Sequence, residues 1–242
     1  MSTGAQPRVV SLVPSATEII SEIGAGPMLV GRSHECDFPA AVVANVPVLT
    51  AARTVFESSA QVDRDVRDAM ARNEPLYTLD AELLAKLRPD VIITQDLCRV
   101  CSIDLDAVRR VAAALSPAPR IISLDPMTVE DVLDDHLRVG EALGMTREAE
   151  SAVVRLRGRM FAAMDYVPSF VEGPVVAFLE WTDPMFIAGH WTPQLIERAG
   201  GRHPLNATVT QDRAGAGAGP AGQTLRAAGK SLWSVIMELQ AV

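Results

Sequence analysis

Residues 128–166 read TVEDVLDDHLRVGEALGMTREAESAVVRLRGRMFAAMDY, and this stretch decides how the rest of the chain is organised. Its pattern predicts two successive helices. Thr128 suits the N-cap of the first helix, Glu130 and Asp131 follow in its first turn, and Gly144 stands where that helix ends. Everything before this pair of helices is expected to form one α/β lobe.

The second helix is expected to begin near Thr146 and to carry one apolar stripe. Its apolar residues recur at helical spacing and arginines occupy its other face: Ala149, Ala152, Val153, Leu156, Met160, Ala163, Met164 and Val167 against Arg155, Arg157 and Arg159. A helix of roughly 20 residues spans about 30 Å. We expect a strut between two lobes, because a new strand is expected at 175–179, after Pro168 and Pro174. An ordinary core helix that ends a single domain is the alternative.

Short β-rich runs, each followed by a polar loop and then by helical spacing, precede the two helices. They are Val9–Val13, Val91–Thr94 and Ile121–Leu124, with Met28–Gly31 as a weaker run. This alternation predicts a mainly parallel sheet. In such sheets ligands bind beyond the carboxyl ends of the strands, so the loops after these runs are the candidate site. Residues 51–75, with a helix expected from Ser58 to Arg72, are interpreted as a surface insertion.

Composition excludes several classes of protein. The 242 residues suffice for one large domain or two small ones. A formal net charge of -8 and a pI near 5.0 argue against nucleic acid as a partner. The sequence shows no cationic and apolar leader and no membrane-spanning apolar run, so we expect a cytoplasmic protein without membrane insertion. Three cysteines do not suggest a disulfide scaffold.

Two helix starts are expected to face the ligand. After the first strand come Pro14 and Ser15, where Ser15 can cap a helix and Glu18 can close a capping box. The free N–H groups of such a helix start suit an anion or a polar ligand edge, although a well-capped helix alone would explain the residues. Near residue 190 the pattern repeats, with Thr192 as N-cap, Pro193 as first helical residue and Gly200-Gly201 as the stop.

Two further loops concentrate groups that can bind ligands. One holds His34, Glu35, Cys36, Asp37 and Phe38, and the other holds Gln95, Asp96, Leu97, Cys98 and Cys101. The three cysteines with His34 could form a zinc site, and Cys98 with Cys101 could form a redox pair. Inert buried cysteines, or a loop that lines a ligand cleft, are the other interpretations. No nucleophile-elbow, Walker or dinucleotide motif is present, so we expect no enzyme and no catalytic cofactor.

Taken in order, several segments resemble one known family. They are RVVSLVPSATE (8–18), VGRS (30–33) leading to DFP (37–39), LRPDVII (87–93) and DPMFIAG (183–189) through AGG (199–201). This series, which covers roughly Arg8 to Asn206, is similar to the substrate-binding proteins of iron-siderophore and cobalamin ABC importers. These are class III periplasmic binding proteins, and the cobalamin-binding branch is the nearest.

The resemblance implies two α/β lobes with mainly parallel sheets, joined by a rigid helix, and a cobalamin-like corrinoid held between them without catalysis. It implies that the loops carrying Pro14 and Ser15, residues 34–38, residues 95–101, and Glu180 with Trp181 line the cleft. Trp181 and Trp191 would supply flat contact area, and His34 or His190 would approach the cobalt. A ferric siderophore or haem is the alternative ligand.

The resemblance divides the chain into an N-terminal lobe (1–127), connecting helices (128–168), a partial C-terminal lobe (169–206) and an atypical Gly/Ala-rich tail (207–242). The second lobe is therefore expected to be incomplete, with weak ligand affinity and protease cleavage between Asp212 and Lys230. Residues 231–239 could form a short amphipathic helix. Docking on an ABC permease is doubtful, because Asp104 or Asp106 offers a carboxylate in the first lobe and the second lobe lacks the matching strand.

Overall fold

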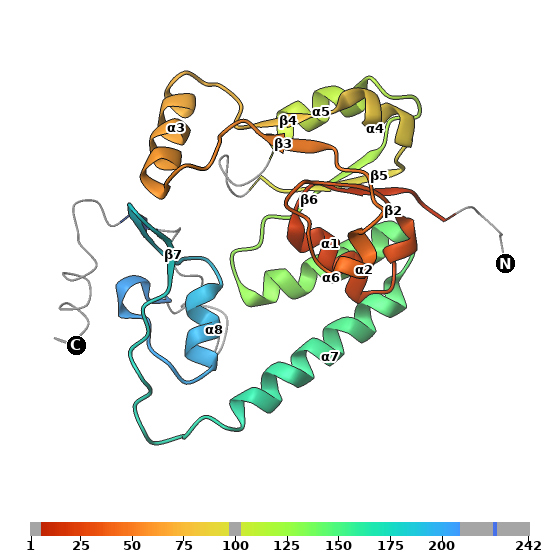
Figure 1. Ribbon diagram of the computed structural model, residues 1–242. Coiled ribbons are helices and arrows are strands. Elements are labelled where there is room, and N and C mark those ends of the chain that lie inside the picture. Colours follow the sequence, from red (N-terminus) through yellow and green to blue (C-terminus); the bar gives the residue numbers. More distant parts are fainter. Residues whose placement is uncertain (1–5, 97–102, 209–224, 227–242) are drawn as a thin grey trace. The chain divides into compact units, whose positions relative to one another are not determined.

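The computed structural model describes residues 6–96, 103–208 and 225–226. The chain forms two compact units, each assembled from several segments (Figure 1). The first contains Met1–Val55, Asp65–Asp125 and Asp134–Val154, and the second contains Phe56–Arg64, Pro126–Leu133 and Arg155–Val242. Among the described helices, none combines the length and the apolar character that crossing a membrane requires.

A four-stranded parallel sheet forms the centre of the first unit. Its strand order is β2-β1-β5-β6, with β1 at Val9–Ser11, β2 at Leu29–Arg32, β5 at Val91–Thr94 and β6 at Arg120–Ser123. All four expected β-rich runs therefore contain a strand, and their parallel pairing is confirmed. Because the chain passes from β1 to β2 on one side and later returns to β5 on the other, the strand order reverses between β1 and β5, which is where open α/β sheets bind ligands.

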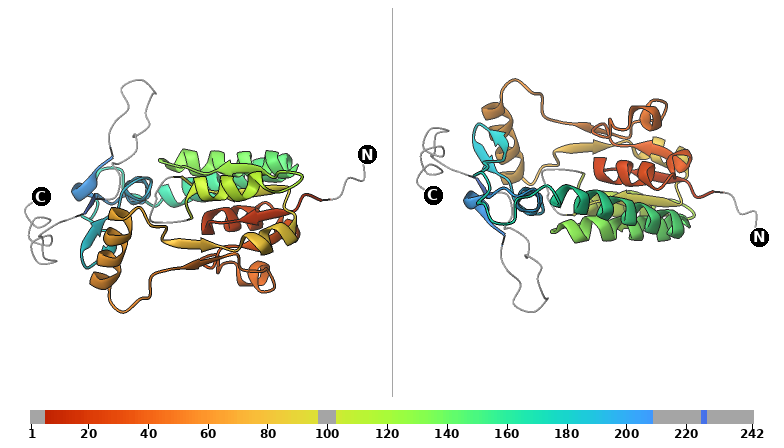
Figure 2. Two further views of the ribbon diagram at one scale, coloured as in Figure 1. Left: turned by 90° about the horizontal axis from the view of Figure 1, so that it is seen from above. Right: turned by 90° about the horizontal axis from the view of Figure 1, so that it is seen from below.

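Helices cover both faces of this sheet, because its buried strands are apolar on both sides. Val10 and Ile92 pack towards α4 (Ala81–Leu87) and α5 (Leu105–Ala113). Val9 and Ile93 pack on the other face, in a cluster with residues of α1 (Pro14–Glu22), α6 (Val129–Leu143) and α7 (Thr146–Met164). In Figure 1, α4 and α5 lie above the strands of this sheet, and α1 and α6 lie below them; Figure 2 gives the views from these two sides.

The two expected helices exist, and the local signals that predicted them are confirmed. The Thr128 hydroxyl accepts the N–H of Asp131 at 3.0 Å, and a carboxylate oxygen of Asp131 accepts the N–H of Thr128 at 2.8 Å. This reciprocal pair caps α6. Gly144 adopts a φ of +70° just after α6, a conformation that glycine reaches without strain. The second helix begins at Thr146 as expected.

The apolar stripe of α7 is buried only in its first half. Ala149, Ala152 and Val153 lie in the protein interior, whereas Ala163 and Met164 near the helix end are exposed. The first half thus behaves as a core helix of the first unit, and the helix then continues into segments of the second unit. The domain boundaries at residues 127 and 168 stay predictions.

In the stretch interpreted as a surface insertion, residues 51–75, Ala69 is the one buried residue, which agrees with that interpretation, and the residues that flank the stretch on both sides pack against the core. An antiparallel hairpin pairs β3 (Thr50–Ala52) with β4 (Tyr77–Leu79), and α3 (Ser59–Ala71) lies between them in sequence. Leu49, just before β3, is buried and packs in the cluster that contains Leu84. The remaining short helices of this unit are η1 (Gly26–Met28) and α2 (Ala40–Val43).

In the described part of the second unit, a three-stranded sheet pairs antiparallel, whereas a mainly parallel sheet was expected. It contains β7 (Leu179–Thr182), β8 (Met185–Ile187) and β9 (Leu225–Arg226). Only Asp183 and Pro184 connect β7 to β8, and so short a connection joins antiparallel strands only. Besides parts of earlier helices, this unit contains α8 (Thr192–Arg198) and η2 (Pro204–Asn206).

Two expectations for this unit are wrong in detail. Of the strand expected at 175–179, Leu179 alone lies in a strand, as the first residue of β7. Val175 and Val176 pair with the segment around Arg202 through one isolated bridge. Helix α8 has Trp191 as its N-cap, with Thr192 already helical, so the expected start is displaced by one residue. The expected stop is confirmed, since Gly200 has a φ of +83° after the C-cap residue.

Candidate ligand-binding site

The carboxyl edge of the parallel sheet brings together the loops that follow β1, β2, β5 and β6. Helix α1 begins directly after β1, with Pro14 as its first residue and Val13 as N-cap. The predicted capping box of Ser15 and Glu18 is wrong: the helix begins two residues earlier than that motif requires, because proline is pre-organised for the first helical position. No side chain caps α1, and Ser15 is exposed in its first turn.

The loop after β2 is held closed by an arginine. A terminal nitrogen of Arg32 donates to the carbonyls of Cys36 at 2.9 Å and of Ser33 at 3.2 Å. The backbone N–H of Ser33 donates to the carbonyl of Ser11 on β1 at 2.9 Å. These bonds tie the loop to both of the strands that it adjoins.

Within this loop Cys36 is a buried residue of the interior. Its side chain is fully buried, and its sulfur lies 3.9 Å from the carbonyl oxygen of Ser11. Burial raises the pKa of the Cys36 thiol, and hydrogen bonds from Thr17, Ser33 and Ser11 oppose that rise. The thiol is therefore neutral at physiological pH, which favours the interpretation as an inert buried cysteine over a thiolate ligand.

His34 of the same loop is half-buried and has a defined orientation. Its Nδ1 lies 2.7 Å from Oγ1 of Thr50, and its backbone N–H donates to the same oxygen at 3.1 Å. The Tyr77 ring stands 5.7 Å from the imidazole, tilted by 47°. Glu35, Asp37 and Phe38 are exposed, and 61% of Phe38 is accessible. An oriented imidazole and an exposed aromatic ring thus lie on one loop.

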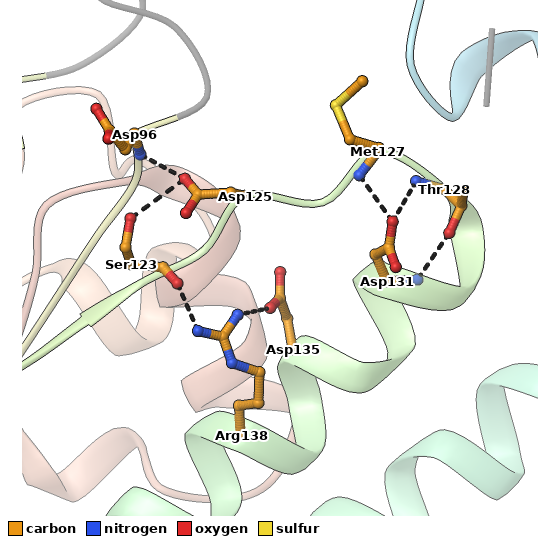
Figure 3. Close-up of polar contacts among 8 residues, drawn as sticks. All are labelled: Asp96, Ser123, Asp125, Met127, Thr128, Asp131, Asp135 and Arg138. Carbon is orange, nitrogen blue, oxygen red and sulfur yellow. Dashed lines mark hydrogen bonds and ion pairs between the residues drawn. The ribbon is translucent and has the colours of Figure 1, made fainter.

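The loops after β5 and β6 are joined by a carboxylate that the sequence analysis missed. Asp125 accepts the backbone N–H of Asp96 at 2.6 Å and the hydroxyl of Ser123 at 3.2 Å (Figure 3). Arg138 of α6 donates to the Ser123 carbonyl at 2.7 Å and pairs with Asp135 at 2.8 Å. The position of Asp125, at the end of a parallel strand, was the signal that could have found it.

Of the site residues predicted in the loop after β5, some belong to the described part of the chain and others do not. Gln95 is half-buried and Asp96 is exposed at the end of β5. Leu97, Cys98 and Cys101 lie outside the described residues. The zinc and redox interpretations of the Cys-x-x-Cys pair therefore stay predictions. Among the residues that are described, no group of three His, Cys, Asp or Glu side chains could hold a metal ion.

The predicted site residues of the second unit cluster around the β7–β8 hairpin and the start of α8. Glu180 accepts the N–H of Gly189 at 3.4 Å, and the indole of Trp181 donates to the carbonyl of Asp183 at 3.0 Å. His190 has a φ of +54°, and its ring lies 5.9 Å from that of Trp191. The structure therefore brings Glu180 close to the loop that carries His190 and Trp191.

The first turn of α6 binds α8 within the same unit, through contacts that no sequence motif predicts. The buried side chain of Gln194 accepts the N–H of Val129 at 2.8 Å. Arg198 forms an ion pair with Glu130 at 2.6 Å. Gln194 thereby satisfies one of the N–H groups that a helix start leaves without an internal partner.

Solved structures of other proteins share the fold of this chain. No family model and no curated protein matches the chain. Among solved structures, the vitamin B12 binding protein BtuF of Vibrio cholerae matches with a TM-score of 0.62 and 16% identity, over 96% of this chain and 73% of that one. The heme binding protein HutB of Vibrio cholerae matches with a TM-score of 0.63 and 18% identity, over 97% and 73%.

A third match is the heme-binding protein RhuT from Roseiflexus sp. RS-1, with a TM-score of 0.58 and 22% identity, over 82% of this chain and 66% of that one. The chain has the fold of the periplasmic solute-binding proteins. At such identities the likeness extends to the fold alone, and the ligand has to be argued from the residues of the site.

Proposed function

We propose that this chain is a non-enzymatic binding protein for a metal-containing tetrapyrrole, with a cobalamin-like corrinoid as its ligand. The proposed site is the carboxyl edge of the first unit's sheet. Solved proteins of the same fold are described as binding vitamin B12 or heme, and both ligands are flat macrocycles around a metal ion. A flat apolar ligand with a metal at its centre needs apolar contact area and one well-placed donor atom.

The observation that carries the proposal is the state of His34. Its ring is half-buried at the sheet edge, and Nδ1 is held by Thr50 at 2.7 Å. Within the described residues Nε2 has no hydrogen-bond partner. Neutral imidazole is a common ligand for cobalt and iron, and a metal-bound imidazole almost always donates its other N–H to a protein group. Thr50 can accept that N–H.

Other residues of the same loop supply complementary contacts. Phe38 presents an exposed aromatic ring, which provides flat apolar area for a macrocycle. The start of α1, where Pro14 and Ser15 lie and no side chain caps the helix, offers backbone N–H groups to a carboxylate or amide substituent. Glu180, Trp181, His190 and Trp191 are retained as predicted contacts of the second unit.

Calorimetry and tryptophan fluorescence with four ligands test this function: cyanocobalamin, diaquocobinamide, hemin and a ferric hydroxamate siderophore. The proposal predicts saturable binding of the corrinoids, with cobinamide favoured because it lacks a lower base and leaves the cobalt open to imidazole. Tight binding of hemin alone would identify haem as the ligand. Tight binding of the siderophore alone would identify a ferric siderophore as the ligand. Binding of none of the four contradicts the proposal.

A further inference from the structure

The hydroxyl of Thr50 has three polar neighbours, and all belong to the loop that carries the candidate ligand residue. It lies 2.7 Å from His34 Nδ1, 3.1 Å from the His34 backbone nitrogen and 3.0 Å from the Ser33 hydroxyl. Thr50 is buried, with 7% of its surface accessible, and Ser33 is buried as well. These contacts are therefore shielded from competing water.

We propose that Thr50 is the positioning residue of the binding site: it holds the His34 ring through Nδ1 and so leaves Nε2 as the atom that meets the metal of the ligand. This inference rests on the proposed function, and Thr50 is the residue that orients His34 for binding the metal of the ligand. Thr50 does not itself touch the metal in this scheme. It acts on the ligand only through the imidazole.

The chemistry of a hydroxyl suits this role. A threonine hydroxyl has one proton to donate and two lone pairs to accept with. One lone pair accepts the His34 backbone N–H. When the hydroxyl proton is donated to Ser33, the second lone pair accepts Nδ1–H, and the Nε2 lone pair is then free for a metal. When the Ser33 hydroxyl donates to Thr50 instead, the Thr50 hydroxyl can donate its own proton to Nδ1. Thr50 can therefore hold the His34 ring in the same orientation with and without a bound metal.

The backbone around Thr50 is fixed from two sides, which makes it a firm support. Leu49 donates its N–H to the carbonyl of Arg32 at 2.8 Å, and the N–H of Asp80 donates to the carbonyl of Leu49 at 2.8 Å. Thr50 itself pairs with Leu79 in the β3–β4 hairpin. The hairpin is thus bound to the end of β2, two residues before His34, and it also contributes the Tyr77 ring beside the imidazole.

The test compares Thr50→Val, Thr50→Ser and a matched control in titrations with diaquocobinamide. Valine keeps the shape and the strand preference of threonine and removes the hydroxyl. Thr94→Val is the control, because Thr94 is equally buried at the same sheet edge and its hydroxyl has no hydrogen-bond partner among the described residues. Calorimetry measures total binding, and the visible spectrum measures nitrogen coordination to cobalt.

We expect Thr50→Val to weaken coordination by about 10-fold or more, since partners of metal-bound histidines are typically worth 10–100-fold in affinity. Thr50→Ser should restore the wild-type spectrum and Thr94→Val should leave it unchanged. A spectrum and affinity unchanged in Thr50→Val, with the wild type coordinating normally, would overturn the inference and leave the proposed function standing. A wild type that binds no cobinamide would overturn both.

Thr50→Val is useful only if it folds, so its unfolding midpoint is measured alongside. If Thr50→Val does not fold, the test compares coordination in Thr50→Ala with coordination in Thr50→Ser. The serine variant keeps the hydroxyl and has one methyl group fewer. Coordination lost in the alanine variant and kept in the serine variant supports the positioning role. Equal coordination in both contradicts it.

Discussion

The Nδ1 atom of His34 lies 2.7 Å from the hydroxyl oxygen of Thr50, which comes 16 residues later in the chain. One residue follows a strand of the parallel sheet, and the other begins an antiparallel hairpin beside it. The hairpin thereby orients an imidazole at the carboxyl edge of the sheet.

The cap of α6 should contribute measurably to stability. Thr128→Ala removes the hydroxyl that accepts the Asp131 N–H at 3.0 Å, and loss of such a cap typically costs about 1 kcal/mol. Thr128→Ser keeps the hydroxyl and is the matched control. Urea denaturation should show a lower unfolding midpoint for the alanine variant and a nearly unchanged one for serine. Equal midpoints for the two variants would show that the cap is not stabilising.

Two glycines should respond in opposite directions to alanine. At Gly31 a Cβ atom would lie 2.7 Å from Cδ1 of Leu49 and 2.8 Å from Cδ1 of Leu87. These neighbours sit in a packed cluster, so Gly31→Ala should cost about 1–3 kcal/mol. Gly158 of α7 has no atom within 4 Å of such a Cβ, and alanine there should stabilise the helix by roughly 0.5–1 kcal/mol. Thermal unfolding of both variants tests the pair.

The contact between α6 and α8 should depend on its buried amide more than on its ion pair. Gln194→Ala leaves the Val129 N–H without its 2.8 Å partner, and an unpaired buried donor costs about 1–3 kcal/mol. Arg198→Ala removes a half-exposed ion pair with Glu130, which is worth at most about 1 kcal/mol. Unfolding followed by circular dichroism should rank the two variants in this order. A larger loss for Arg198→Ala would contradict it.

The chemistry of Cys36 predicts a dependence of stability on pH. Burial raises the pKa of this thiol above its ordinary value of 9.0, so the folded state holds the thiol proton more tightly than the unfolded chain. The stabilisation is fully present below the unfolded pKa and is lost as the pH rises through the higher folded pKa. The difference in unfolding free energy between wild type and Cys36→Ala should therefore shrink above about pH 9. A difference that grows with pH would refute this assignment.

Much of the chain up to the start of α7 could be predicted from the sequence because its signals are local. The Thr128 cap, the Gly144 stop and the apolar run of β5 each reflect chemistry within a few residues. The β3–β4 hairpin could not be predicted, because its short strands are separated by the whole of α3 and are stabilised by Leu49 packing in a distant cluster. Residues 175–178 have a strand-like composition, but Val175 forms only an isolated bridge with Arg202, so composition predicted a strand that does not form there.

The candidate site was predictable in part for the same reason. The parallel topology places His34, Gln95 and Asp96 at one edge of the sheet, and alternation of strands and helices in the sequence is sufficient to expect that. The roles of Thr50 and Asp125 depend on contacts between segments far apart in the chain. Only packing of the hairpin and of the β5 and β6 ends creates those contacts.

The most direct test of corrinoid binding through His34 is a visible-spectrum titration of the wild type, His34→Ala and His190→Ala with diaquocobinamide. The His190→Ala variant separates the two candidate histidines, since His190 is also half-buried on a predicted binding loop. We expect a saturable spectral shift typical of nitrogen coordination in the wild type and in His190→Ala, and no such shift in His34→Ala. A wild-type spectrum that does not change, or a shift that is lost only in His190→Ala, would contradict this expectation.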